Sequence, residues 1–97
     1  MFSNRRGRIR EQTTACWERI KETLDELNAR LEDIIFIHYF LVHRDDYWDL
    51  FDATNAFWMA HAPDLAENIR ACTLLRGVGL ALPDMRIEIE VIAASAS

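Results

Sequence analysis

One segment constrains this chain more than any other: residues 34–42, Ile-Ile-Phe-Ile-His-Tyr-Phe-Leu-Val, which are apolar or aromatic almost throughout. The pattern alone leaves a helix open, because Leu31, Ile34, His38 and Leu41 fall at helical spacing. The short length, the β-branched residues and the aromatic content favour a strand. A strand that is apolar on both faces needs cover on both, with helices on one side and something else on the other.

The segments on either side of this run predict two amphipathic helices. Residues 11–28 place apolar side chains at spacings of three and four, and Asn28 tolerates the left-handed conformation that often ends a helix. Asp45 or Asp46 can cap a second helix that runs to about His61, where a proline soon breaks the pattern.

The C-terminal half predicts two further strands. Residues 64–71 form a short helix or an irregular connection, residues 73–82 end in an apolar run, and residues 86–92 alternate apolar and charged side chains. A Pro-Asp turn between these strands predicts that they pair antiparallel. The order helix, strand, helix, strand, strand predicts a single α+β domain over residues 1–97, with both helices available for one face of the sheet.

Composition indicates an oligomer that does not bind nucleic acid. The net charge is −5, and 51% of only 97 residues are hydrophobic, so a subunit interface is the natural place to bury the surplus. The basic segment 1–10 carries four arginines, which we interpret as a frayed, solvated end. A phosphate-binding arm is the alternative, but no aromatic residue interleaves with the arginines. We expect residues 94–97 to be frayed as well.

The two cysteines, Cys16 and Cys72, fit no zinc motif and make no disulfide framework, so we expect reduced thiols in a cytoplasmic protein. The first residues have no apolar core of a signal peptide, and no apolar stretch approaches the length of a membrane span. We therefore expect no membrane partner. His, Cys and Asp residues do not pair at ligand spacing on a shared helix or strand, so we also expect no metal site.

The end of the chain resembles the closing signature of the RidA/YjgF family, also called the L-PSP endoribonuclease family. Members end in a Leu-Pro turn followed by an Ile-Glu-Ile-Glu strand, as residues 82–93 do. The agreement extends over residues 7–93 and favours a strand at 34–42. The other matching segments are the helix entry Gly7 to Thr13, the strand opening Asp33-Ile34-Ile35, and the helix start Asp45-Asp46-Tyr47.

This resemblance implies a chorismate-mutase-like fold, in which three subunits pack their sheets around a central barrel. Neighbouring subunits would then cover the second face of the apolar strand. It also implies an activity: hydrolysis of reactive enamines and imines, such as 2-aminoacrylate and 2-iminobutyrate, to 2-keto acids and ammonia. Family members need no cofactor and bind the small 2-imino or 2-keto acid between subunits.

Of the family's two site residues, the Glu has one match in this sequence, whereas the Arg has more than one candidate position. Glu88, the first Glu of Ile-Glu-Ile-Glu, matches the carboxylate that orients or activates the attacking water, although a solvated side chain is the alternative. Arg70-Ala71-Cys72 matches an Arg-x-Cys whose Arg holds the substrate carboxylate in a bidentate pair, with Cys72 in the cleft. Arg76 is an alternative clamp. A third register puts Cys72 at the Arg position and removes the clamp.

Departures from the family leave a second hypothesis open: a non-catalytic oligomeric scaffold that binds a small molecule or a protein. Phe51 stands where many members have Asn, Thr54 where many have Tyr, and the family's two N-terminal strands with their Ser-Gly-Gln segment are not matched. A ribonuclease is a third hypothesis, against which the acidic charge and the scattered His38, His43 and His61 argue. We expect His38 to be a satisfied core histidine.

Overall fold

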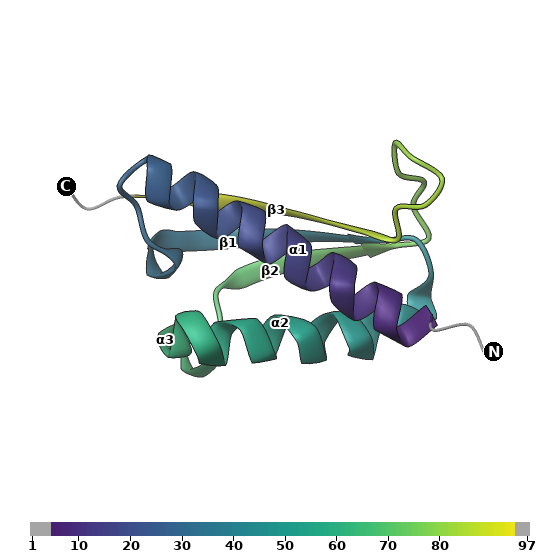
Figure 1. Ribbon diagram of the computed structural model, residues 1–97, viewed down its shortest axis with the longest axis horizontal. Coiled ribbons are helices and arrows are strands. Elements are labelled where there is room, and N and C mark those ends of the chain that lie inside the picture. Colours follow the sequence, from purple (N-terminus) through teal and green to yellow (C-terminus); the bar gives the residue numbers. More distant parts are fainter. Residues whose placement is uncertain (1–4, 95–97) are drawn as a thin grey trace.

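The computed structural model describes residues 5–94, which form a mixed α+β unit and confirm the predicted fold class (Figure 1). A three-stranded sheet carries helices on one face. The elements in chain order are α1 (Arg5–Glu26), a 3-10 turn (Leu31–Asp33), β1 (Ile34–Leu41), a 3-10 turn (Arg44–Asp46), α2 (Tyr47–His61), α3 (Pro63–Glu67), β2 (Ala71–Arg76) and β3 (Ile87–Ala93).

The apolar run is a strand, as predicted, and it takes the centre of the sheet in the order β2-β1-β3. β2 pairs with it in parallel, with Phe36 opposite Ala71, and β3 pairs antiparallel, with Phe40 opposite Glu88. The predicted antiparallel pairing of residues 73–82 with 86–92 is therefore wrong. The apolar β1 separates the two strands, and the α2–α3 crossover between β1 and β2 gives the parallel pairing.

Helix α1 begins at Arg5, six residues before the predicted start. Ile9 is fully buried, and Arg10 Nη2 lies 3.1 Å from Asp52 Oδ2 on α2. The frayed, solvated segment predicted for residues 1–10 is therefore wrong for residues 5–10, because an apolar anchor and an inter-helix ion pair hold this turn. Residues 1–4 lie outside the described part.

The other end of α1 confirms the role predicted for Asn28. This residue adopts φ 59°, the left-handed conformation, just after the last helical turn. The Ala29 N–H donates to the Leu24 carbonyl at 2.8 Å, and the Asn28 N–H donates to the Asp25 carbonyl at 3.1 Å. These two bonds make a Schellman motif, which satisfies carbonyls that the helix end leaves open and turns the chain towards β1.

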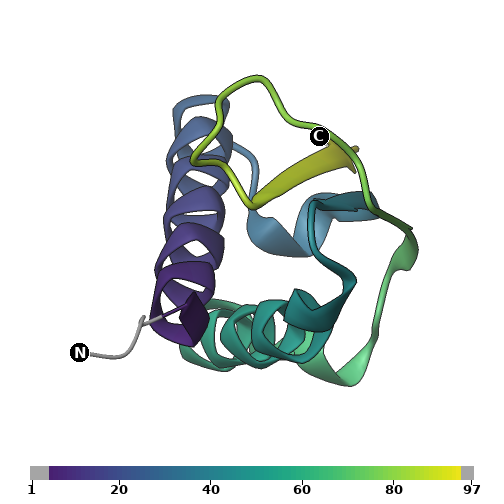
Figure 2. The same cartoon turned by 90° about the vertical axis from the view of Figure 1, so that its right-hand side faces the viewer.

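The core lies between the helices and one face of the sheet, which we call the inner face. Figure 2 shows α1 and α2 on the same side of the sheet, as predicted. On this face Ile37, Tyr39 and Leu41 are buried. Between the helices, fully buried Trp17 donates its Nε1–H to Thr54 Oγ1 at 3.0 Å. One face of the apolar strand is thus covered within the chain.

The opposite, outer face of the sheet is uncovered in the single chain. Phe36, His38 and Phe40 of β1 are only partly buried there, beside Glu88 and Glu90 of β3. His38 Nδ1 lies 2.9 Å from Glu90 Oε1, and its side chain is 34% exposed. The predicted core histidine is therefore wrong, because the pleat points this residue away from the helices. The barrel that would cover this face stays a prediction.

Two contacts hold the ends of β3. Gln12 of α1 donates from Nε2 to the Asp84 carbonyl at 3.0 Å and accepts from the Arg86 N–H at 2.8 Å, which fastens the loop between β2 and β3. Ala94 N–H donates to the Asp33 carbonyl at 2.9 Å. The fraying predicted for 94–97 is thus wrong at Ala94, and residues 95–97 lie outside the described part.

Candidate functional site

A cavity of about 210 Å³ opens between the inner face of the sheet and the pair α2–α3. Four residues singled out by the sequence line it: Arg70 and Cys72 at the start of β2, and Phe51 and Thr54 on α2. Arg70 and Cys72 come together because alternate residues near a strand share a face. The remaining lining residues, which the sequence analysis did not identify, are Ile37, Tyr39, Asn55, Trp58, Ala66 and Ile69.

The Arg70 guanidinium lies at the edge of this cavity and is already hydrogen-bonded by all three nitrogens. Its Nε donates to the Ile34 carbonyl at 2.8 Å, Nη1 to the Asn68 carbonyl at 2.6 Å, and Nη2 to the Glu32 carbonyl at 3.0 Å. Asp64 Oδ2 lies 3.5 Å from Nη2. Arg70 thus ties the α3–β2 connection to the start of β1, and a bidentate ligand would have to replace part of this set.

Apart from Arg70, the polar groups around the cavity are uncharged, and they belong to Tyr39, Thr54, Asn55, Trp58 and Cys72. Burial, with a smaller contribution from Cys72, raises the pKa of the Tyr39 hydroxyl, so this group stays protonated at neutral pH. Trp58 is 5% exposed, and its Nε1–H has no acceptor within the described residues. Cys72 is an exposed free thiol at the mouth of the cavity. The cavity therefore suits an apolar group rather than a charged one.

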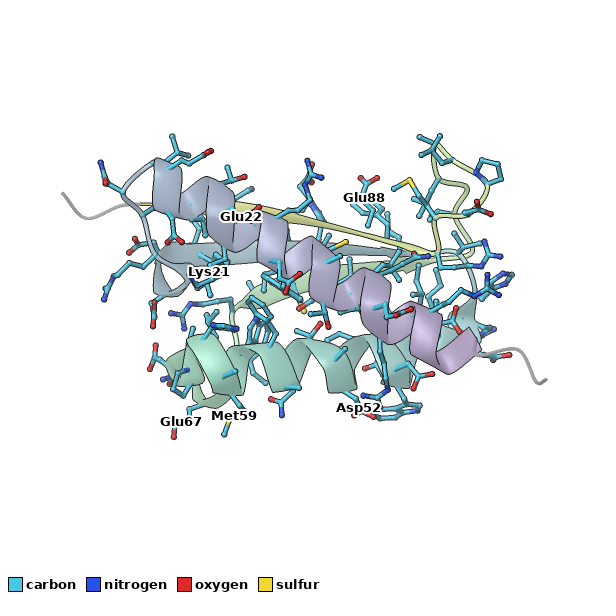
Figure 3. The ribbon with its side chains drawn as sticks, in the orientation of Figure 1. Lys21, Glu22, Asp52, Met59, Glu67 and Glu88 are labelled. Carbon is cyan, nitrogen blue, oxygen red and sulfur yellow. The ribbon has the colours of Figure 1, made fainter. Side chains whose placement is uncertain are left out.

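Glu88 lies elsewhere, on the outer face of the sheet. It is exposed, as the alternation of β3 predicts, and it projects from the side of the sheet away from α2 (Figure 3). Its partner Phe40 is four residues beyond Phe36, which faces Ala71, so Glu88 and the start of β2 are about 13 Å apart along the strands and roughly 10 Å across them. One chain does not bring Glu88 to the cavity.

Arg76, the alternative clamp, is also remote from the cavity. It ends β2, and its guanidinium carbon stacks 5.0 Å from the ring centroid of Tyr47. It borders an open depression with His43, Arg44 and Asp45 beside the end of β1. Glu88 and Arg76 therefore lie towards one end of the sheet, but on opposite faces of it.

Two features of the described residues bear on other functions. Within residues 5–94, His, Cys, Asp and Glu side chains do not gather in groups of three or more that could hold a metal ion. Of the helices described, none is long and apolar enough to cross a lipid bilayer.

The sequence matches the family described as Endoribonuclease L-PSP over residues 3–95. The chain is 32% identical over 87 residues to Protein mmf1, mitochondrial, of Schizosaccharomyces pombe, a match that covers 90% of this chain and 51% of that protein. The chain thus spans about half the length of this curated relative. The relative is named as mitochondrial, and the cytoplasmic location expected for this chain stays a prediction.

Solved structures share the fold. A protein from Salmonella typhimurium superposes with a TM-score of 0.74 at 23% identity, covering 90% of this chain and 70% of that one. A protein from Pseudomonas aeruginosa superposes with a TM-score of 0.72 at 26% identity, covering 89% and 69%. In both cases the additional length belongs to the other protein.

Proposed function

We propose that this chain, which belongs to the RidA/YjgF family (Endoribonuclease L-PSP), hydrolyses 2-imino acids and the enamines that tautomerise to them. The oxygen of a water molecule bonds to C2 of the imine, the C–N bond breaks, and a 2-keto acid and ammonia leave. Water is the co-substrate, so the balance requires no redox partner. The chain's task is to hold the imino acid and to position or deprotonate the water.

The position of Glu88 is the observation that supports this proposal most. It is a carboxylate on an apolar sheet face, next to Phe40, and it forms no hydrogen bond or ion pair with the other described residues. Its neighbour Glu90, by contrast, is engaged with His38. Glu88 is therefore available to accept a proton from water, as a general base must be.

The distance between Glu88 and the cavity supports a site that is shared between subunits. In a homotrimer, the outer face of one subunit would pack against another, and Glu88 of one chain would reach the cavity of its neighbour. Such head-to-tail contacts close into rings and repeat the same site at each interface. The site would then exist only in the assembly.

Arg70 is our first choice for the carboxylate of the ligand. The ligand would replace Asp64, whose oxygen is the most distant of the four partners, and it would compete with neutral carbonyls for the guanidinium. The bonds that Arg70 already makes are charge-assisted as well, so the exchange would gain through geometry, because the two oxygens of one carboxylate match the guanidinium fork in a bidentate pair. Arg76 remains the alternative ligand for the substrate carboxylate because it is exposed and ends β2, the strand that Arg70 precedes.

A non-catalytic binding protein of the same fold is the second candidate. The specific observation in its favour is the engagement of Arg70, whose three nitrogens all donate to the chain itself. If this residue is only a structural tie, the cavity accepts an apolar ligand without a carboxylate clamp.

Imine hydrolysis distinguishes the two candidates. An amino-acid oxidase generates the imine in situ, and the rate of keto-acid release is compared with buffer for the wild-type chain, Glu88→Gln and Glu90→Gln. We expect acceleration by the wild type, a loss of about 10²–10⁴-fold in Glu88→Gln, and nearly full activity in the matched control Glu90→Gln. A wild-type rate equal to buffer would remove the deaminase proposal and leave the binding protein.

A further inference from the structure

We infer that the cavity selects a substrate with a large apolar side chain, a branched aliphatic or aromatic 2-imino acid rather than 2-aminoacrylate. This inference rests on the proposed function and specifies its substrate class. The carboxylate would stay at the mouth, near Arg70, and the side chain would enter the space between β1, β2 and α2.

The size of the cavity supports this choice. Its volume is about 210 Å³, and an apolar cavity of roughly 150 Å³ is enough to hold a benzene molecule. The single methylene of 2-aminoacrylate would leave most of this space empty, so the wall atoms would lose the contacts that a filling group gives them. A branched or aromatic side chain fills the volume.

The chemistry of the wall supports the same choice. Large apolar or aromatic side chains supply half of the ten lining residues: Ile37, Tyr39, Phe51, Trp58 and Ile69. Thr54 has a hydroxyl, but its oxygen already accepts the Trp17 indole N–H at 3.0 Å. Asn55 and Cys72 are exposed, so their polar groups lie towards solvent, and a polar substrate side chain buried against the apolar wall would cost free energy, whereas burial of an apolar one is favourable.

Binding of the corresponding 2-keto acids tests the inference without turnover. Pyruvate, 4-methyl-2-oxopentanoate and phenylpyruvate are titrated into the assembled wild-type protein by calorimetry. We expect the two larger acids to bind at least about tenfold more tightly than pyruvate, since each buried methylene strengthens binding roughly fourfold. Equal affinities, or tighter binding of pyruvate, would overturn the inference.

Two variants, each with leucine in place of an alanine, test whether the preference for large keto acids depends on this cavity. Ala66 on α3 lines it, so Ala66→Leu fills part of the space and should reduce the preference to less than about threefold. The matched control is Ala60→Leu, because Ala60 is exposed on α2 and does not line the cavity. An unchanged preference in a folded Ala66→Leu protein would place the selectivity elsewhere. Thermal unfolding checks that both variants fold.

The two proposals fail in different ways. Binding that favours large keto acids, without imine hydrolysis, would contradict the deaminase and support the cavity's selectivity. Hydrolysis at equal rates for the imines of alanine, leucine and phenylalanine, with equal binding of their keto acids, would support the deaminase and contradict the selectivity.

Discussion

The two faces of the sheet differ in what the single chain does with them. On the inner face, Ile37 and Tyr39 are buried under the helices, and the cavity opens beside them. On the outer face, Phe36 and Phe40 stay partly exposed beside two glutamates, and Ile92 is 52% exposed. The inner face provides the packing that stabilises the fold and a pocket. The outer face provides the Glu88 carboxylate and an apolar surface that no other part of the described chain covers.

The packing that stabilises the fold and the proposed catalytic carboxylate therefore lie on opposite faces of the sheet. Apolar side chains that meet no partner within the chain commonly mark an interaction surface. Here they surround Glu88, so the proposed catalytic group lies where another subunit would pack. The comparison can be tested by making the same change on each face.

The largest effect is expected from removing equal apolar side chains on the two faces. Ile37→Ala should lower the free energy of unfolding by about 2–5 kcal/mol, because Ile37 is fully buried and its loss leaves a cavity. Ile92→Ala should cost less than about 1 kcal/mol in the dissociated chain, since half of Ile92 is exposed. Urea unfolding at low protein concentration measures both. Equal losses would contradict the difference between the faces.

A smaller effect is expected from a polar contact of the inner face. Thr54→Val keeps the shape of the side chain but removes the acceptor of the buried Trp17 indole N–H. An unsatisfied buried donor should lower the free energy of unfolding by about 1–3 kcal/mol. Thr23→Val, on the exposed side of α1, is the control and should change little. If both variants unfold alike, the Trp17–Thr54 bond contributes nothing measurable.

The smallest effect is expected from the polar contact of the outer face. Glu90→Gln weakens the pair with His38, whose members are 59% and 34% exposed. With His38 protonated the contact is an exposed ion pair, which contributes at most about 1 kcal/mol, and salt then screens it, so the difference from wild type should shrink further in high salt. Unfolding at two salt concentrations measures it. A loss larger than that of Thr54→Val would mean that the outer face is more tightly built than its exposure indicates.

Local patterns predicted much of the fold. The alternation of β3 and the left-handed Asn28 each follow from a few neighbouring residues. α2 begins directly after Asp46, as predicted, but the Asp46 side chain does not form the capping hydrogen bond on which that prediction was based. The strand pairing was predicted wrongly, because the Pro-Asp turn suggested that β2 and β3 pair with each other, whereas both pair with the apolar β1 between them. The start of α1 was missed because the arginines near Ile9 suggested solvent, while the helix buries Ile9 and pairs Arg10 with Asp52.

The candidate site was predictable residue by residue but not as a site. The exposure of Glu88 and the proximity of Arg70 to Cys72 follow from strand periodicity. The cavity depends on how α2 and α3 pack on the sheet, and the engagement of Arg70 depends on carbonyls of residues 32 and 34, far away in the sequence. Such long-range packing leaves no signal in a single sequence.

Subunit mixing tests the central claim, that Glu88 and the cavity act together only across a subunit boundary. Chains carrying Glu88→Ala and chains carrying Arg70→Ala, each inactive alone and each folded, are mixed by joint refolding, and imine hydrolysis is measured. A site shared between subunits predicts that about a quarter of the interfaces regain both groups, with activity to match. Mixed assemblies no more active than either parent would contradict a shared site.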